Sequence, residues 1–324
     1  MGSLLLLLAC GSASGTKATV AIPSPHASRA LANTTSVKES QPTMPTTWKN
    51  SSARPPALAQ VDLPSPPRSG DSEVKVLQRI VMLEETLVKL RVSDANHALT
   101  LRQLAEAYGD LGLVNTEKAR RLTAERDTAL AQHSPAAELE TQRHQASASR
   151  RKAQDRAAML YRRLVDLHPQ DPHNDEALYF LGCEYESRIP TDGNDPSQLA
   201  RQREGTARAQ ATYAELIERY PSSEFAPVAS LASGDISFDE AAAGRLDWSV
   251  PIEAYERSAS SGQPQKNRYF AFAEYKLGFA LWNRGDRKQA FAAFSQALTA
   301  ARRDPTAPGA VVIVGDALTA ISEL

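Results

Sequence analysis

A self-match across fifty-two residues is the feature that most limits what this chain can fold into. Two segments carry the same residue types in the same order and at the same spacing. The pairs are Ala157 with Ala209, Tyr161 with Tyr213, Leu164 with Leu216, Pro169 with Pro221, and Gly182 with Gly234. Repeated helix pairs cannot bury their apolar faces alone, so they stack on one another. The self-match therefore predicts a helical array.

The spacing of apolar residues also indicates helices. From Val74 onward they recur three and four positions apart, which is typical of an amphipathic helix, and residues 95–112 repeat this pattern. Between residues 113 and 168 only Pro135 interrupts a helical reading. Alanine is abundant and aromatic residues make up 6% of the chain, a composition that favours helix over a β-sandwich. We therefore expect an all-α fold.

The last complete unit resembles the tetratricopeptide (TPR) pattern. The resemblance is carried by Leu277, Gly278, Leu281, Gly285, Asp286, Ala290, Phe294 and Ala297. Gly278 and Ala290 are small where two antiparallel helices approach closely, and Phe294 fills the gap to the next helix. Gly285 and Asp286 are typical of a turn. We expect a TPR-like solenoid whose repeat-packing residues are Ala105, Gly182, Gly234, Gly278, Ala290 and Phe294.

The resemblance also implies a concave groove, lined by residues of each first helix that point away from the helix–helix packing. These residues are Tyr179, Leu231, Phe238, Phe272, Tyr275, Phe279, Trp282 and Asn283. A large apolar patch of this kind usually marks a binding site. The predicted ligand is an apolar helix or an extended peptide with basic flanks. The alternative is that a terminal helix from residues 306–324 covers this surface as a cap.

The N-terminus predicts export and lipid anchoring. The leucine run Leu4–Leu8 is too short to span a bilayer but suits a signal peptide. The stretch Leu7-Leu8-Ala9-Cys10 resembles a bacterial lipobox, which implies cleavage before Cys10 and acylation of that residue. Residues 11–72 hold 9 of the 20 prolines and many Ser and Thr residues, which predicts a disordered tether.

Five regions follow from these patterns. They are a signal peptide at 1–9, a lipidated Cys10 with a disordered linker at 10–72, long helices including a first degenerate repeat at 73–168, TPR-like repeats at 169–305, and a C-terminal capping helix at 306–324.

A closer resemblance is to TPR lipoproteins of the bacterial cell envelope, in particular myxobacterial proteins of the gliding-motility type. It is carried by the segments 175–182, 234–240 and 275–282. The resemblance implies a periplasmic scaffold that binds other envelope proteins through the concave groove and the membrane through its lipid anchor. Gly11 after Cys10 favours the outer membrane. The alternative is an accessory or regulatory subunit of an envelope enzyme or of an outer-membrane or peptidoglycan assembly machine.

Catalytic and cofactor motifs are missing from the sequence. None of the six histidines forms an HExxH motif, and there is no nucleophile elbow, P-loop or GxGxxG. Two cysteines far apart exclude a disulfide framework and a zinc site. The net charge of -1 argues against nucleic-acid binding. We therefore predict no enzyme activity, cofactor, metal, nucleic acid or small-molecule substrate.

Charge is unevenly distributed along the chain. Residues 118–163 carry a net charge of +6, and residues 174–256 carry -10. One interpretation is that the protein has a basic end and an acidic end, which orient it against charged partners. The other is simply a soluble helix beside a soluble array.

Overall fold

The protein is all-α in the part of the chain that the structure describes. This computed structural model describes residues 72–187, 196–261 and 267–324. Those residues form ten helices and no strand, which confirms the expected fold class. The predicted signal peptide, Cys10 and the tether lie outside the described residues.

The helices follow one another with short connections. Their bounds are α2 Glu73–Lys89, α3 His97–Ala131, α4 Ala137–Leu167, α5 Asn174–Glu186, α6 Pro196–Arg219, α7 Ala226–Ala242, α8 Ser249–Ser260, α9 Phe270–Arg284, α10 Arg287–Arg303 and α11 Ala310–Glu323. Among the described helices, none is both long enough and apolar enough to cross a membrane.

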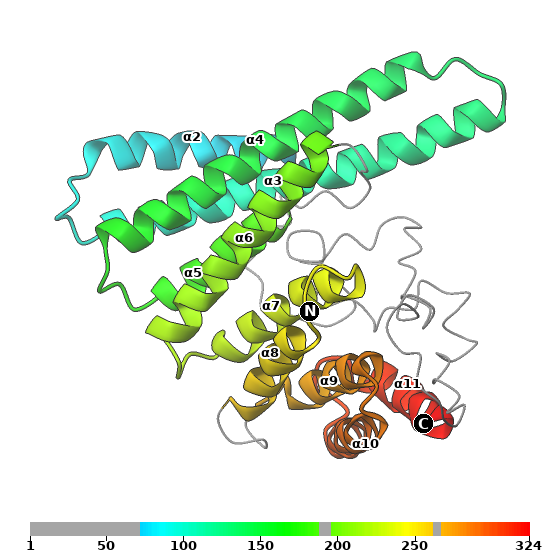
Figure 1. Ribbon diagram of the computed structural model, residues 1–324. Helices are drawn as coiled ribbons and strands as arrows, with labels where there is room; N and C mark the ends of the chain where they lie inside the picture. The colour runs from blue at the N-terminus through cyan, green and yellow to red at the C-terminus, as the bar shows by residue number, and fades with distance from the viewer. Residues whose placement is uncertain (1–71, 188–195, 262–266) are drawn as a thin grey trace.

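Four antiparallel hairpins make up most of the array (Figure 1). They are α3–α4, α5–α6, α7–α8 and α9–α10, and the second helix of each packs against the first helix of the next unit. Helix α2 packs on α3 at one end, and α11 packs on α10 and α9 at the other. Each unit therefore packs mainly on its neighbours, as in other stacked repeats.

A glycine facing an aromatic ring defines three of the four hairpins. A Cβ atom added to Gly182 would lie 2.3 Å from the Tyr213 ring, and one added to Gly234 would lie 2.5 Å from the Tyr255 ring. At Gly278 the distance to the Phe294 ring would be 2.6 Å. Real Cβ atoms do not approach other heavy atoms this closely. The absence of a side chain at these positions therefore lets the two helices of each hairpin pack together.

Alanine takes the small positions that remain. Ala105 in α3 and Ala290 in α10 are fully buried at helix crossings. The turn between α9 and α10 is made by Gly285, whose φ of 100° is left-handed, a conformation that glycine adopts without strain.

The first hairpin is longer than the others. Helix α3 has 35 residues and α4 has 31, whereas the remaining helices have 12 to 24. At a rise of about 1.5 Å per residue, α3 is about 50 Å long. Its far end extends beyond the other units, as Figure 1 shows, so the tip of the hairpin projects from the array.

Candidate interaction site

The residues expected to line an open groove lie mostly inside the protein. Seven of the eight side chains are buried: Tyr179, Leu231, Phe238, Phe272, Tyr275, Phe279 and Trp282. Asn283 is half-buried, and its Nδ2 donates a hydrogen bond to the Phe279 carbonyl at 2.8 Å. The expectation that these aromatic side chains form an exposed groove is therefore corrected, because they belong to the core.

Contacts with neighbouring helices explain part of this burial. The Tyr275 and Phe279 rings pack edge-to-face with centroids 4.9 Å apart, and Phe279 packs in the same way on Phe294 of α10 at 5.1 Å. The Tyr275 hydroxyl donates a hydrogen bond to Asp316 Oδ2 of α11 at 2.9 Å. Helix α11 therefore covers Tyr275, as the cap interpretation expects.

Ionisable groups are also buried among the first helices. Lys276 Nζ of α9 lies 3.0 Å from both carboxylate oxygens of Asp235 in α7. The Tyr255 hydroxyl of α8 donates to Asp235 Oδ1 at 2.7 Å. This Asp235–Lys276 pair joins two successive units. Asp235 directly follows Gly234, and a charged residue beside a packing glycine is the one sequence signal that could have indicated it.

Glu186 of α5 is a second buried carboxyl group. Its Oε2 accepts a hydrogen bond from the Tyr213 hydroxyl at 2.9 Å. Burial raises the pKa of Glu186 well above its ordinary value, with the Tyr213 hydrogen bond acting in the opposite direction. Burial therefore favours the protonated form of Glu186, which packs inside the α5–α6 hairpin.

Two further carboxyl groups have a raised pKa. Burial raises the pKa of Glu106 to about 7, helped by nearby Glu176, and burial together with Glu256 raises the pKa of Glu274 to about 7. Burial is the largest cause in both cases. These shifts therefore follow mainly from packing inside the array.

In the described part of the chain, two histidines come together in a pair that the sequence did not indicate. His97 Nδ1 at the start of α3 lies 2.7 Å from His168 Nε2, just after α4. Burial, followed by His168, lowers the pKa of His97. Within the described ranges, no three His, Cys, Asp or Glu side chains are grouped so that they could hold a metal ion.

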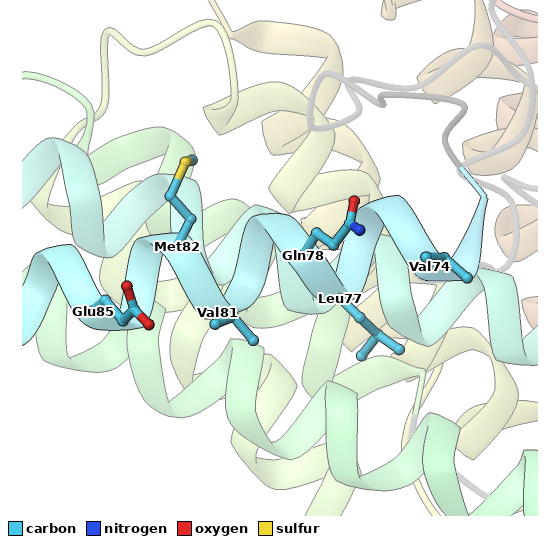
Figure 2. A pocket seen from close by; sticks show the side chains of 6 residues that line it. All are labelled: Val74, Leu77, Gln78, Val81, Met82 and Glu85. Atoms are coloured by element: carbon cyan, nitrogen blue, oxygen red, sulfur yellow. The ribbon is translucent and has the colours of Figure 1, made fainter.

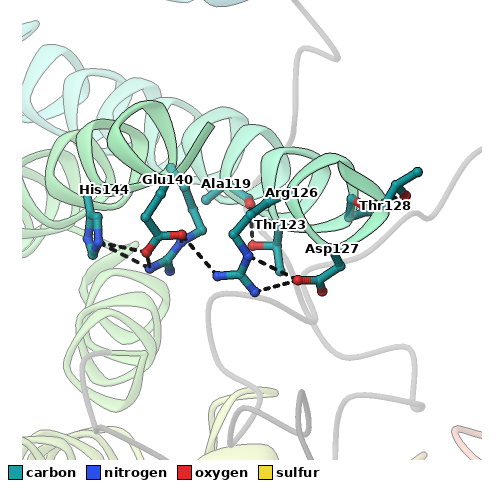
Figure 3. A network of polar contacts seen from close by, with 9 residues as sticks. Ala119, Thr123, Arg126, Asp127, Thr128, Glu140 and His144 are labelled. Atoms are coloured by element: carbon teal, nitrogen blue, oxygen red, sulfur yellow. Dashed lines mark hydrogen bonds and ion pairs between the residues drawn. The ribbon is translucent and has the colours of Figure 1, made fainter. Parts of the chain in front are cut away.

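The projecting tip of α3–α4 carries a network of partly exposed charges (Figure 3). Arg126 of α3 contacts Glu140 of α4 at 3.0 Å, and His144 Nε2 lies 2.9 Å from the same carboxylate. Hydrogen bonds from Arg143 and then Arg126 lower the pKa of Glu140 to about 2. The network ties the two helices together near their connection.

Helix α2 carries the other notable surface, which is apolar. A shallow hollow of about 440 Å³ lies along its outer side. Figure 2 shows the six side chains that line it. The hollow is lined by Val74, Leu77, Gln78, Val81, Met82 and Glu85. The opposite side of α2 is buried on α3 through Val76, Ile80 and Leu83. Helix α2 is therefore apolar on two sides, and only one of them is covered in the described part of the chain.

Comparison with known families identifies the repeat type. A family model described as tetratricopeptide repeat matches residues 198–223, which span most of α6 and the turn after it. No curated protein matches the chain. The chain therefore contains TPR sequence, a repeat that generally binds other proteins and is generally not catalytic.

Proposed function

We propose that this TPR-containing protein is a non-enzymatic scaffold that holds partner proteins in the bacterial cell envelope. The TPR match and the stacked hairpins support a role in protein binding. The aromatic residues that the sequence places in the groove are buried in the core, so the partner surface lies elsewhere. The projecting α3–α4 hairpin is the best candidate.

Charge on this hairpin indicates the type of partner. Residues 118–163 carry a net charge of +6, and much of this stretch lies beyond the other units. Arg151 and Lys152 of α4 are exposed. A basic projection attracts acidic surfaces and speeds their association, within a Debye length of about 10 Å at ordinary salt. The partner in this proposal presents an acidic surface to α4.

The anchoring part of the proposal rests on the N-terminal sequence. Leu7-Leu8-Ala9-Cys10 supports lipid attachment at Cys10, and Gly11 supports an outer-membrane location with the array facing the periplasm. Stable anchoring needs more than one acyl chain, which lipidation of an N-terminal cysteine supplies. Fractionation of cells should find the protein with membranes, and Cys10→Ala should release it. An N-terminal peptide without an acyl group in mass spectrometry would contradict anchoring.

Partner binding is tested by charge reversal on α4. Arg151→Glu combined with Lys152→Glu should lose the proteins that cross-link to the wild type in cells. The matched control reverses Arg302 and Arg303, which are exposed at the end of α10. Equal cross-linking by both double variants would reject the hairpin as the partner surface. Both variants should keep the wild-type circular dichroism, because all four side chains are exposed.

A further inference from the structure

Two histidine rings hold together the end of the first hairpin that lies opposite its projecting tip. We call this end the hairpin base. It consists of the connection before α3, residues 90–96, the connection after α4, residues 168–173, and the helix ends beside them. His97 Nδ1 lies 2.7 Å from His168 Nε2, although the two residues are 71 positions apart in the chain. The contact therefore joins the chain entering the hairpin to the chain leaving it.

The main chain is fixed at both histidines. His97 is only 2% exposed, and its amide donates to the Asp94 carbonyl at 3.0 Å. The His168 amide donates to the Leu164 carbonyl at 2.9 Å, and the His168 carbonyl accepts a hydrogen bond from Asn174 Nδ2 of α5 at 2.7 Å. Since the main chain holds the two rings beside each other, their protonation decides whether the ring contact forms.

A hydrogen bond between two imidazole rings tolerates one positive charge but not two. A neutral ring has one N–H group and one bare nitrogen, so a neutral pair or a pair with one charged ring can form the bond. When both rings are charged, all four ring nitrogens carry protons. Two N–H groups would then face each other across 2.7 Å, and the two charges would repel. Protonation of the second ring therefore breaks the contact.

The surroundings of His97 disfavour its positive charge in the closed form. Burial is the largest cause that lowers the pKa of His97, followed by His168 and by Arg163 of α4, whereas Asp94 acts in the opposite direction. The α5 side chain bonded to His168 is Asn174, which does not titrate. An open hairpin base exposes His97 to water and restores its ordinary affinity for protons. Opening is therefore coupled to proton uptake.

The next unit of the array has no histidine at the equivalent positions. Asn174 is the first residue of α5, as His97 is the first residue of α3. The fifty-two-residue self-match pairs His168 with Tyr220, and a proline follows each of them. Asparagine and tyrosine side chains do not take up protons near neutral pH. The packing of a unit therefore does not require histidine at either position.

We propose that the His97–His168 pair is a pH-sensitive switch, which keeps the hairpin base closed at neutral pH and opens it when both rings are charged, at about pH 5–6. Opening separates the first turn of α3 from the connection that leads to α5. The first hairpin is then attached less firmly to the α5–α6 unit, so acid alters how its projecting tip is presented. This inference does not depend on the partner proposed above.

Hydrogen exchange of the full chain across pH tests the switch. The double variant, His97→Asn with His168→Tyr, carries the residues of the next unit at both positions. Exchange is followed by mass spectrometry from about pH 7.5 to about pH 5, with rates corrected for the intrinsic pH dependence of amide exchange. In the wild type, opening of residues 96–101 and 164–171 should increase by up to about tenfold per pH unit while one proton is taken up. The double variant should lack this increase.

Two controls separate the switch from general effects of acid. His144→Gln removes an exposed histidine at the hairpin tip and should keep the wild-type response of the hairpin base. In the wild type, the helices α9 and α10 should show no comparable increase in opening over the same pH range. An increase of equal size in α9 and α10 would mean that the whole array loosens in acid, which would overturn the proposal.

His97→Gln gives a second variant if the double variant alters the melting curve. A glutamine amide both donates and accepts, so it can bond to His168 in either protonation state of that ring. Opening of the hairpin base in this variant should not depend on pH through the contact. No increase in the wild type, or an increase in the tested variant equal to that of the wild type, would overturn the proposal.

Discussion

Replacing Gly278 by alanine tests whether close helix approach holds the hairpins together. The added Cβ would lie 2.6 to 2.8 Å from three atoms of the Phe294 ring. That ring cannot move aside easily. It is fully buried, and its centroid lies 5.1 Å from Phe279, 6.1 Å from Tyr275 and 6.2 Å from Trp282.

The expected magnitude combines two opposing effects. Overpacking a well-filled core costs about 1–3 kcal/mol, and contacts this short at a fixed ring place the cost near the upper end. Alanine is the better helix former by about 1 kcal/mol, which offsets part of that loss. Gly278→Ala should therefore lower the free energy of unfolding by about 2 kcal/mol.

Gly315 provides the matched control. It lies within α11, and a Cβ there would have no heavy atom within 4 Å. Gly315→Ala should raise the free energy of unfolding by about 1 kcal/mol, the helix-propensity gain alone. Urea denaturation followed by circular dichroism measures both variants. Combining Gly278→Ala with Phe294→Leu should recover part of the loss. If Gly278→Ala were as stable as Gly315→Ala, the steric argument for the hairpins would fail.

Three further substitutions test the buried and surface charges. Lys276→Met should lower the free energy of unfolding by about 3–5 kcal/mol, because Asp235 is left buried without its cation, and adding Asp235→Asn should restore much of it in the same urea titration. Glu274→Gln should stabilise the protein at pH 8. The folded-state pKa of Glu274 is raised from 4.5 to about 7, so the wild type loses stability as the pH rises through that range. Thermal melting temperatures of the variant should not show this decrease with pH. Glu140→Gln should speed amide exchange at the tip of α3–α4 at neutral pH. The folded-state pKa of Glu140 is lowered to about 2, so its charged form stabilises the tip above that range. The exchange rate of the wild type should therefore approach that of the variant only as the pH falls from 4.5 towards about 2. Unchanged exchange on losing the contact with Arg126 would show that this network does not hold the tip.

The sequence predicted the helices and their closest contacts well, because both depend on local patterns. Helices follow from the three- and four-residue spacing of apolar side chains. Gly182, Gly234 and Gly278 recur at equivalent positions, and each faces a ring of its own hairpin. The turn at Gly285 was also predictable, since a glycine followed by aspartate at a helix end favours a left-handed residue.

The surroundings of the expected groove residues could not be predicted in the same way. Counting from Gly278 shows which side of α9 carries Tyr275 and Phe279, but not what packs against that side. The approach of α11 depends on the angle between successive hairpins. The Asp235–Lys276 pair has the same origin, because its members are 41 residues apart on different units. The charged residue beside Gly234 marks Asp235, but no local pattern on either helix indicates that Lys276 is its partner.

The Asp235–Lys276 pair also determines which helices of the array unfold together. In a stack of repeats, each unit can unfold with some independence from its neighbours. Asp235 of α7 is bound at once by Tyr255 of α8 and Lys276 of α9, so separating α9 from the preceding hairpin exposes an unpaired charge in the interior. Native-state amide exchange should therefore report α7, α8 and α9 as one cooperative block. The tip of α3–α4, held by its own two helices, should exchange much earlier.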